Sequence, residues 1–397
     1  MASARTHRLL GYLDVRFAYP FQPFDLALKP AETELATREG VAVAMVQGSG
    51  PLWLFAKAPD EFGVCLSPHL LRDTPPNPDS FARALRSPAI AQPFGWMEGC
   101  VLDGLHHRHA LLGSEPDRAA LLRHLHLYFD RRETPRYAPH TDVPVQHGSE
   151  GLLPFAVLAK HDPAHPSFEG MLAFCERAQE AGGTIRDNRI TTAEGCYTLA
   201  YPLAALGSAR DDRRLRSLAV TQLLHRIERL TSPGALYLRA SDEGKRTFRN
   251  WARGLAWFAL GIVRTWHELP LGEAPMLVRD AFRWCAELAL AWQREDGLWS
   301  CFIDHPETGV ETSGSAGIAA ALAAGARLLT DPARALRAAR AAHRTLMRRY
   351  LVPGGFLGSV SQANRDGERL QRHGYRVIGH FGAGLLAQLD ALLAVCE

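Results

Sequence analysis

The side chains that most clearly indicate chemistry lie in residues 250–269, which read N-W-A-R-G-L-A-W-F-A-L-G-I-V-R-T-W-H-E-L. Apolar residues recur there at helical spacing and predict a helix packed on several sides. Arg253 falls in the first turn of this helix, where a cation opposes the helix dipole. With Trp251 and Trp257 beside it, the pattern indicates a pocket for an anion or a sugar. The alternative is that both tryptophans are core residues and Arg253 pairs with a carboxylate.

Several other kinds of chemistry lack their sequence signatures. The chain has 17 histidines, of which His106, His107 and His109 are close in sequence. Their spacing places them on different faces of a helix, and no H-E-x-x-H occurs. We therefore predict no metal site and no cofactor. There is also no G-x-S-x-G, P-loop or Rossmann fingerprint after a strand.

Composition places the chain among globular proteins with a large core. Of its 397 residues, 47% are hydrophobic, and 45 Lys+Arg against 42 Asp+Glu leave a net charge of +3. Without a basic tract or a run of about 18 apolar residues, we expect neither nucleic-acid nor membrane binding. The seven cysteines are scattered, and the N-terminus lacks a signal-peptide pattern. A cytoplasmic, soluble protein is expected, either a monomer or a homodimer.

The elements that must position these residues are mostly helices. Residues 1–75 are expected to form an N-terminal extension, with a β-hairpin made by residues 41–46 and 52–56 around Q-G-S-G-P. Residues 76–397 are expected to form a helical domain. The predicted helices span 80–87, 95–112, 117–131, 148–160, 166–181, 192–206, 211–230, 251–269, 274–294, 312–329, 332–350 and 380–395.

The joints between helices are of two lengths. Short joints such as L-G-S-E-P-D at 112–117 and L-T-D-P-A-R at 329–334 predict tight αα-hairpins. Longer polar joints, such as 231–250 and 351–379, all fall between hairpins and should therefore gather at one end. This pattern favours an all-α fold, the closed (α/α)6 barrel, with ligand bound at the loop-rich end. The alternative is an open α-solenoid, although no repeat consensus is found.

Six motifs, met in order over residues 95–395, together resemble the unsaturated uronyl hydrolases, which comprise unsaturated glucuronyl and rhamnogalacturonyl hydrolases. The second motif is similar to the catalytic helix of that family, W-V-D-G-L-Y-M followed by P-x-L-A-x-x-G, and the third to W-G-R-G-N-G-W. The motifs are G-W-M-E-G-C-V-L-D-G-L (95–105), A-E-G-C-Y-T-L-A-Y-P-L-A-A-L-G (193–207), N-W-A-R-G-L-A-W (250–257), Q-R-E-D-G-L-W (293–299), E-T-S-G-S-A (311–316) and H-F-G-A-G-L-L-A (380–387).

The resemblance implies an (α/α)6 barrel and an unusual reaction. The family hydrates the C4=C5 bond of a 4,5-unsaturated uronic acid at the non-reducing end of an oligosaccharide. A carboxylic acid protonates C4, water adds at C5, and the resulting hemiketal opens to release the remaining sugar. Such an acid must hold its proton near neutral pH, which requires desolvation or a like-charged neighbour. A cation for the uronate carboxylate and aromatic surface for the sugar are also required.

The catalytic residues implied by the resemblance depart from the family pattern at two positions. The catalytic Asp of the family falls on Glu194, whose longer side chain moves the carboxyl by roughly one C–C bond, about 1.5 Å. A histidine of the family falls on Arg239, which would suit a more anionic substrate. Asp142, in T-D-V-P-V-Q-H, is predicted as the second carboxylate, with Glu150 as its competitor. The residue-level alternative for Glu194 is a carboxylate that only stabilises a helix N-terminus.

The leading hypothesis is a glycoside hydrolase that acts on oligosaccharides ending in an unsaturated uronic acid. Alternatives are a glycosidase of intact uronosides, a polysaccharide lyase on the same barrel, and a non-catalytic carbohydrate-binding barrel. Catalysis is assigned to Glu194 and Asp142. Substrate binding is assigned to residues expected at the loop-rich end, namely Arg253, Trp251, Trp257, Arg239, His147, His380, Ser313 and Ser315.

Overall fold

The computed structural model of the chain describes residues 1–19, 22–48, 70, 78–129, 134–138, 143–186, 188–364 and 366–396. In this part of the chain all twelve helices expected from the sequence are present, with ends shifted by a few residues. Two further helices, α1 (Pro30–Glu39) and α13 (Gly367–Arg372), were not expected.

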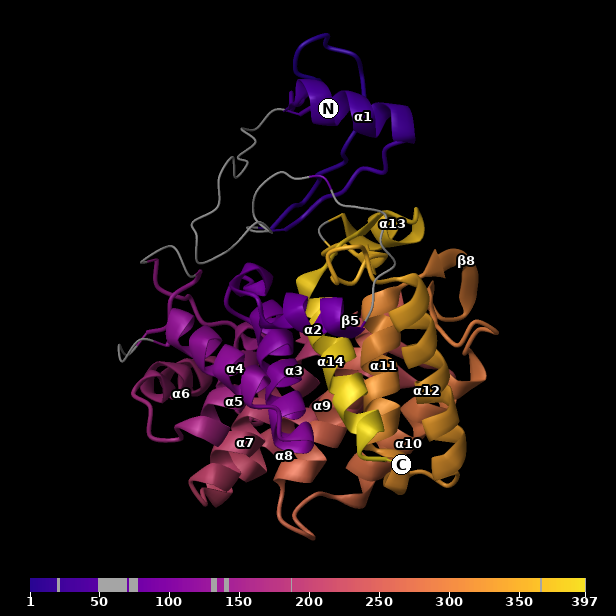
Figure 1. The fold of residues 1–397 in the computed structure, drawn as a ribbon. Coiled ribbons are helices and arrows are strands. Elements are labelled where there is room, and N and C mark those ends of the chain that lie inside the picture. The colour runs from indigo at the N-terminus through magenta and orange to yellow at the C-terminus, as the bar shows by residue number, and fades with distance from the viewer. Residues whose placement is uncertain are drawn as a thin grey trace.

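The helices form a closed double ring (Figure 1). In the inner ring each helix packs against the next, and α14 returns to pack against α3. The outer helix α2 packs against α14 and completes the sixth hairpin. The inner helices are α3 (Trp96–Leu112), α5 (Leu153–His161), α7 (Tyr201–Ala209), α9 (Ala252–Glu268), α11 (Thr312–Ala324) and α14 (His380–Ala394). The outer helices are α2 (Pro78–Arg86), α4 (Glu115–Tyr128), α6 (Ser167–Ala178), α8 (Arg213–Leu230), α10 (Met276–Ala291) and α12 (Pro332–Arg349).

This arrangement confirms the (α/α)6 barrel and excludes the open solenoid, because the last inner helix contacts the first. The short joints fold as their residues predict. The Ser114 hydroxyl accepts the backbone N–H of Asp117, and the Asp212 carboxylate accepts those of Arg214 and Leu215. These caps satisfy N–H groups that have no partner inside the helix, and so fix where each outer helix begins.

The ring closes through unusually close helix contacts at glycines. A Cβ added to Gly384 on α14 would lie 2.2 Å from the carbonyl oxygen of Cys100 on α3. A Cβ at Gly104 would lie 2.5 Å from the carbonyl oxygen of Gly384. Only residues without a side chain permit this approach. The sequence motif H-F-G-A-G of α14 therefore has a direct packing function in closing the barrel.

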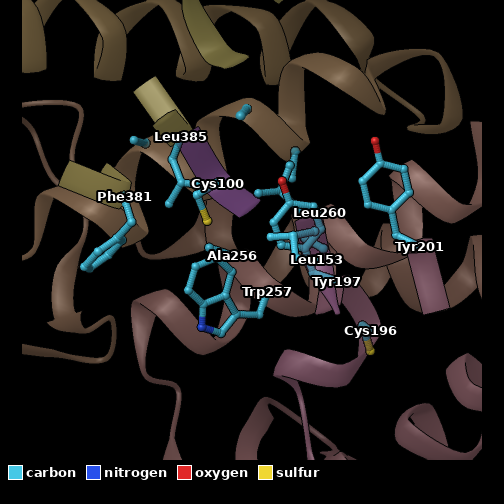
Figure 2. Close-up of a cluster of buried hydrophobic side chains, with 14 of the residues drawn as sticks. Cys100, Leu153, Cys196, Tyr197, Tyr201, Ala256, Trp257, Leu260, Phe381 and Leu385 are labelled. Atoms are coloured by element: carbon cyan, nitrogen blue, oxygen red, sulfur yellow. The ribbon is translucent and has the colours of Figure 1, made fainter. Parts of the chain in front are cut away.

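The centre of the ring is filled with side chains. Figure 2 shows residues of five inner segments converging there, among them Cys100, Leu153, Tyr197, Trp257 and Leu385. All of them belong to one buried hydrophobic core. Close packing of this kind leaves no open channel along the axis of the described helices. Any substrate must therefore bind at one end of the ring.

Short antiparallel strands occupy the long joints that precede inner helices, and β5, β8 and α13 lie at the same end of the barrel (Figure 1). This confirms that the long joints gather at one end, which we call the mouth. The strands of the mouth are β3 (Thr191–Thr192), β4 (Thr231–Ser232), β5 (Ala235–Ala240), β6 (Arg246–Arg249), β7 (Ser300–Phe302), β8 (His305–Val310), β9 (Val360–Ser361) and β10 (Arg376–Val377). Strand β5 pairs with β3, β4 and β6, β7 pairs with β8, and β9 pairs with β10.

The N-terminal extension lies above the mouth (Figure 1). Its strand β2 (Val41–Ala42) pairs with β1 (Ala2–Ser3), and helix α1 packs beside them. The expected hairpin partner, residues 52–56, lies outside the described residues, and so does the domain boundary expected near residue 75. Among the described residues, no helix is both long enough and apolar enough to cross a membrane.

Candidate active site

Glu194 begins the segment that leads into inner helix α7. Strand β3 delivers it to the mouth, and the backbone N–H of Ala193 donates to the carbonyl of Leu238 on β5 (2.8 Å). The Glu194 side chain is only 7% exposed, and its Oε2 atom has no hydrogen-bond partner among the described residues. An unpartnered buried carboxyl oxygen is costly, so its presence at the mouth of the barrel marks a candidate site.

The environment of Glu194 favours the protonated acid. Burial, and next the negative charge of Glu150, raise its pKa from 4.5 to about 8. The cations Arg239 and Arg253 and the Glu194 backbone amide oppose this shift without cancelling it. A carboxyl group with this pKa is mostly protonated at neutral pH and can therefore act as a general acid. The direction of this shift is the one that a proton donor at this position requires.

The second carboxylate near Glu194 is Glu150, the competitor in the sequence analysis. It lies in the 3-10 helix η4 (Ser149–Gly151), just before α5. The Thr198 hydroxyl donates to the carbonyls of Ser149 (2.7 Å) and Glu194 (3.1 Å) and so joins the segments that carry the two acids. Asp142, our first choice for this position, lies outside the described residues.

The helix that follows Glu194 is irregular. Residues Cys196–Ala200 form a π-helix, η5, before the regular helix α7 begins. Gly261 of α9 lies against this segment, and a Cβ at that position would lie 2.2 Å from the backbone carbon of Cys196. Short π-helical insertions occur frequently at functional sites, because they redirect side chains at the cost of regular hydrogen bonds. Here the irregular turn directly follows the candidate acid.

A buried arginine holds the loop that leads to Glu194. Arg226 of α8, 1% exposed, donates to the carbonyls of Ile185 (3.1 Å) and Thr192 (3.1 Å). Its guanidinium also occupies the space beside Gly195, where a Cβ would meet it at 2.2 Å. Its neighbour Gln222 accepts the N–H of Ile185 (2.9 Å). Together these side chains of α8 fix the backbone on both sides of β3.

Arg253 lies in the first turn of α9, as expected, and is 2% exposed. Its guanidinium donates to the carbonyls of Ser361 (2.6 Å) and Gln362 (3.2 Å), in the loop before α13. Burial lowers the pKa of Arg253, and the charge of Glu311 most strongly opposes that shift. Arg253 and Glu194 also act on each other's pKa, which places the cation and the acid in one electrostatic environment.

Aromatic rings surround Arg253. Its guanidinium lies 4.5 Å from the ring centroid of Trp251 and 5.1 Å from that of Phe381. Trp251 and Trp257 are 1% and 2% exposed, so neither ring offers an open face in this structure. Trp96 at the start of α3 is partly exposed and packs edge-on against Trp257 (5.6 Å). Trp96 is therefore the tryptophan of this group with surface available to a sugar.

The serines of the E-T-S-G-S-A motif are held by the protein itself. The Ser313 hydroxyl donates to the carboxylate of Glu311 (2.6 Å), which also accepts the N–H groups of Ser313, Gly314 and Ser361. The Ser315 hydroxyl donates to the carbonyl of Glu311 (2.7 Å). Because Ser361 also binds Arg253, Glu311 ties the start of α11 to the loop that holds the arginine.

The remaining candidates divide between the site and its surroundings. Arg239 on β5 acts on the pKa of Glu194 and lies over the ring of Phe248 (5.7 Å). His380 is buried at the start of α14, within hydrogen-bond distance of Gln92 (2.9 Å) and stacked on Phe356. His147 packs beside Phe155 and Phe174, toward the outer helix α6. Burial lowers the pKa of both histidines, to about 3 for His380.

A buried polar network lies next to the aromatic residues of the site. Asp103 of α3 accepts the hydroxyl hydrogens of Tyr197 (2.5 Å) and Tyr201 (3.1 Å), and Gln388 of α14 donates to the Tyr197 oxygen (3.0 Å). Burial alone would raise the pKa of Asp103. The charge of His107, and the hydrogen bonds that Asp103 accepts, lower this pKa. Tyr197 stacks on Trp257 (5.9 Å), so this network fixes the position of that tryptophan.

Sequence reasoning did not single out Trp96, Glu311 or Arg226. The sequence did contain a signal for Trp96. It directly follows Gly95 at the start of an inner helix, and in this barrel the inner helices start at the mouth. Arg226 carried no local signal for its function, since the loop carbonyls that it binds lie 34 and 41 residues away in the chain. Glu311 caps its own helix locally, but its hydrogen bond to Ser361 spans 50 residues. No group of three or more potential metal ligands occurs in the described residues.

The barrel is similar to solved structures of carbohydrate-active enzymes. A glycoside hydrolase of family 105 from C. acetobutylicum is 14% identical, with a TM-score of 0.68, covering 80% of this chain and 99% of that one. A family 88 glycosyl hydrolase from Bacteroides vulgatus is 16% identical, with a TM-score of 0.59 and coverages of 77% and 92%. The unsaturated glucuronyl hydrolase from Bacillus sp. GL1, described as responsible for glycosaminoglycan degradation, is 16% identical, with a TM-score of 0.60 and coverages of 80% and 95%.

No curated protein sequence matches the chain. The family model of Glycosyl Hydrolase Family 88, however, matches residues 197–397, just over half of the chain. The matched part starts at the π-helix beside Glu194 and includes Arg253 and the whole of α9, α11 and α14. The chain therefore belongs to Glycosyl Hydrolase Family 88.

Proposed function

We propose that this glycosyl hydrolase acts on oligosaccharides with a 4,5-unsaturated uronic acid at the non-reducing end. Glu194 protonates C4 of the double bond, and water adds to the electron-deficient C5. The resulting hemiketal opens and releases the rest of the sugar. Membership of family 88 and the likeness to an unsaturated glucuronyl hydrolase support this substrate class.

The single observation that carries the proposal is the burial of Glu194 at the barrel mouth, with its Oε2 atom lacking a hydrogen-bond partner among the described residues. Protonation of a carbon–carbon double bond requires an acid that keeps its proton at the pH of the reaction. Burial and the charge of Glu150 raise the Glu194 pKa to about 8. An exposed glutamate would be ionised at neutral pH and could not serve this step.

Glu150 and Glu194 have different functions in this proposal. Glu194 gives its proton to C4, and the resulting carboxylate can take a proton from the water that attacks C5. That exchange regenerates the acid without a cofactor. The negative charge of Glu150 raises the pKa of Glu194. Arg253 and Arg239 provide positive charge beside Glu194, where the uronate carboxylate would lie.

The test is to incubate the purified protein with unsaturated disaccharides and follow the ultraviolet absorbance of the conjugated double bond. Hydration destroys the chromophore, so absorbance should fall as the free sugar appears. A polysaccharide lyase would make absorbance rise on an intact polymer. If the absorbance falls with none of the substrates in a varied panel, the proposal is contradicted.

The second candidate is a hydrolase of intact uronosides. It is favoured by one observation, the neighbouring carboxylates Glu150 and Glu194, because most glycosidases use two such groups. Release of sugar from a saturated uronoside, with no change in ultraviolet absorbance, would select this activity.

We further propose a cytoplasmic location and a monomeric or homodimeric state. The described cysteines are all free, and five of them are buried, as is usual in a reducing compartment. Fractionation of the source cells and light scattering of the purified protein test these two statements.

A further inference from the structure

Strand β5, which lies at the mouth of the barrel (Figure 1), places a cation beside the segment that carries the candidate acid. Its residues Leu236, Leu238 and Ala240 are buried, whereas the alternate residues Tyr237 and Arg239 are partly exposed. Neighbouring side chains of a strand point to opposite faces, so Arg239 lies on the face turned away from the core. Part of the Arg239 side chain is therefore accessible to solvent at the mouth.

Strand pairing fixes how close Arg239 lies to Glu194. Arg239 is directly opposite Thr192 of β3, and the Ala193 N–H donates to the Leu238 carbonyl (2.8 Å). Directly opposite residues of antiparallel strands are about 4.5–5.5 Å apart at their Cα atoms. Because Glu194 is two residues beyond Thr192, the register of the strands alone brings the cation beside the acid. The charge of Arg239 lowers the pKa of Glu194, as this proximity requires.

Arg239 has no partner of opposite charge within the described part of the chain. Its guanidinium lies over the ring of Phe248 (5.7 Å) and forms no hydrogen bond or ion pair with a described residue. The carboxylates closest to this position have other partners. Asp242, at the end of the same hairpin, pairs with Arg189 (3.0 Å), and Glu368 accepts the backbone N–H of Phe248 (2.6 Å). The Arg239 guanidinium is therefore available to an anionic ligand.

The Thr192 hydroxyl is a second polar group without a partner next to Arg239. It is buried, and its Oγ1 atom has no hydrogen-bond partner among the residues that the structure describes. Side chains of directly opposite residues lie on the same face of a sheet, so this hydroxyl and the guanidinium are neighbours. Buried polar groups normally have a partner, and an unpaired one indicates a ligand group. A group that pairs with both must accept hydrogen bonds and carry negative charge, as a carboxylate does.

Arg253 is held in a different way. It is 2% exposed and donates to the carbonyls of Ser361 (2.6 Å) and Gln362 (3.2 Å). The rings of Trp251 (4.5 Å) and Phe381 (5.1 Å) enclose its guanidinium. These hydrogen bonds hold the loop before α13, and burial makes Arg253 the less accessible of the two cations near the acid.

We propose that Arg239 and the Thr192 hydroxyl bind the uronate carboxylate of the substrate directly, while Arg253 holds the loop at Ser361 and Gln362. The inference rests on the proposed function, since it names the residues that meet the uronate. A guanidinium always carries its charge and can donate two parallel hydrogen bonds to one carboxylate. Arg239 is then the specificity residue for the anionic part of the substrate.

The experiment measures by calorimetry the Kd of a saturated uronyl disaccharide and of its neutral glucosyl counterpart. The ratio of the two Kd values reports carboxylate recognition, because general damage to the site weakens both ligands alike. Arg239→Gln should weaken the uronyl ligand by roughly tenfold to a hundredfold, the effect of a hydrogen bond to a charged group, and leave the neutral ligand unchanged. Arg239→Lys keeps the charge without the two-donor geometry and should give an intermediate ratio.

Arg246→Gln is the matched control, because Arg246 is an exposed arginine on the adjacent strand β6. This variant should keep the wild-type ratio. Thr192→Val removes the hydroxyl and should weaken the uronyl ligand less than Arg239→Gln does. In the absorbance assay, Arg239→Gln should raise KM for the unsaturated disaccharide by the same factor as Kd, while kcat changes little at a pH where Glu194 is protonated.

An Arg239→Gln protein that keeps the wild-type ratio would overturn the inference. Equal weakening of both ligands, or a wild type that binds the two equally well, would overturn it as well. An unchanged ratio in Thr192→Val would refute the assignment of the hydroxyl. If the wild-type protein hydrates no unsaturated substrate, the proposed function fails, but the calorimetric ratio still decides whether Arg239 recognises a carboxylate.

Discussion

At the residue scale, the chemistry of the site depends on where one proton resides. Glu194 is almost fully buried, and its pKa is about 8 because burial and the charge of Glu150 together exceed the opposing effect of Arg239 and Arg253. The same surroundings that raise this pKa also provide cations for an anionic substrate. In the proposed function, proton donation and uronate binding therefore depend on the same few charges.

Glu194→Gln keeps the shape of the side chain and removes the acidic proton. We expect kcat to fall by about 10²–10⁴-fold, the usual contribution of a general acid, while KM changes little. The absorbance assay measures both constants. Turnover close to that of the wild type would show that another group supplies the proton.

The same variant changes how stability depends on pH. Between the ordinary pKa of 4.5 and the folded value of about 8, the unfolded chain releases the Glu194 proton while the folded chain retains it. The wild type therefore loses stability as the pH rises through this range. Urea denaturation should show that Glu194→Gln gains stability relative to the wild type between about pH 5 and about pH 8. If the difference in unfolding free energy between the two proteins were the same at every pH, the raised pKa of Glu194 would be contradicted.

Glu150→Gln should act through Glu194. Removing the negative neighbour lowers the Glu194 pKa, since one of the two causes that raise it is lost. The high-pH limb of the kcat profile should therefore move to lower pH. Glu287→Gln, on the outer surface of the barrel, is the control and should leave the profile unchanged. If the pH profile of Glu150→Gln coincides with that of the wild type, Glu150 is not the second carboxylate.

At the element scale, the position of Glu194 depends on three elements that meet behind it. Strand β3 pairs with β5, the π-helix η5 packs against Gly261 of α9, and Arg226 of α8 binds both β3 and the loop before it. None of these contacts is local in sequence. The acid is therefore placed by the packing of neighbouring hairpins around the ring, and a change on an outer helix should reach it.

Arg226→Gln tests this positioning. Loss of the hydrogen bonds to Ile185 and Thr192 should let the Glu194 segment shift, and a displacement of about 1 Å costs about 10²-fold in rate. We expect kcat to fall more than KM, and the high-pH limb to move to lower pH as water reaches Glu194. Arg214→Gln changes an exposed arginine of the same helix and should have no effect. If Arg226→Gln lowers stability but leaves kcat and the pH profile unchanged, Arg226 has a structural role only.

At the scale of the whole molecule, the barrel depends on the closure between its first and last inner helices. Helices α3 and α14 approach each other through Gly104 and Gly384, where added side-chain atoms would overlap the backbone. The N-terminal extension contacts the mouth through hydrogen bonds of Gln22 and Tyr375. Segments near both ends of the chain therefore meet at the mouth.

Gly384→Ala should destabilise this closure. Its Cβ would lie 2.2 Å from the Cys100 carbonyl oxygen, so the helices must separate. Overpacking of this kind typically costs about 1–3 kcal/mol. Gly182→Ala is the control, because no atom lies within 4 Å of its added Cβ. Urea denaturation of both variants measures the difference, and equal stability would show that the ring adjusts without strain.

The sequence by itself determined the barrel and its mouth. Helix periodicity and the capping residues Ser114, Asp212 and Asp331 are local signals, and alternating short and long joints order the hairpins. Ordered hairpins of this kind place every inner helix start at one end. Arg253 was proposed from its place in the first turn of an inner helix, whereas Glu194 was proposed from the family resemblance, and both lie at the start of an inner segment.

Only the tertiary structure decided which groups act on each other. It brought Glu150 to Glu194, packed Trp251 against Arg253, left Trp96 partly exposed, and joined Gln22 to Gln362 in the loop before α13. Burial and charge–charge effects depend on atoms from hairpins far apart in sequence. No local sequence pattern shows which distant hairpins will meet. The pKa values, the exposed faces of side chains and the identity of the second carboxylate can therefore be known only from the closed ring.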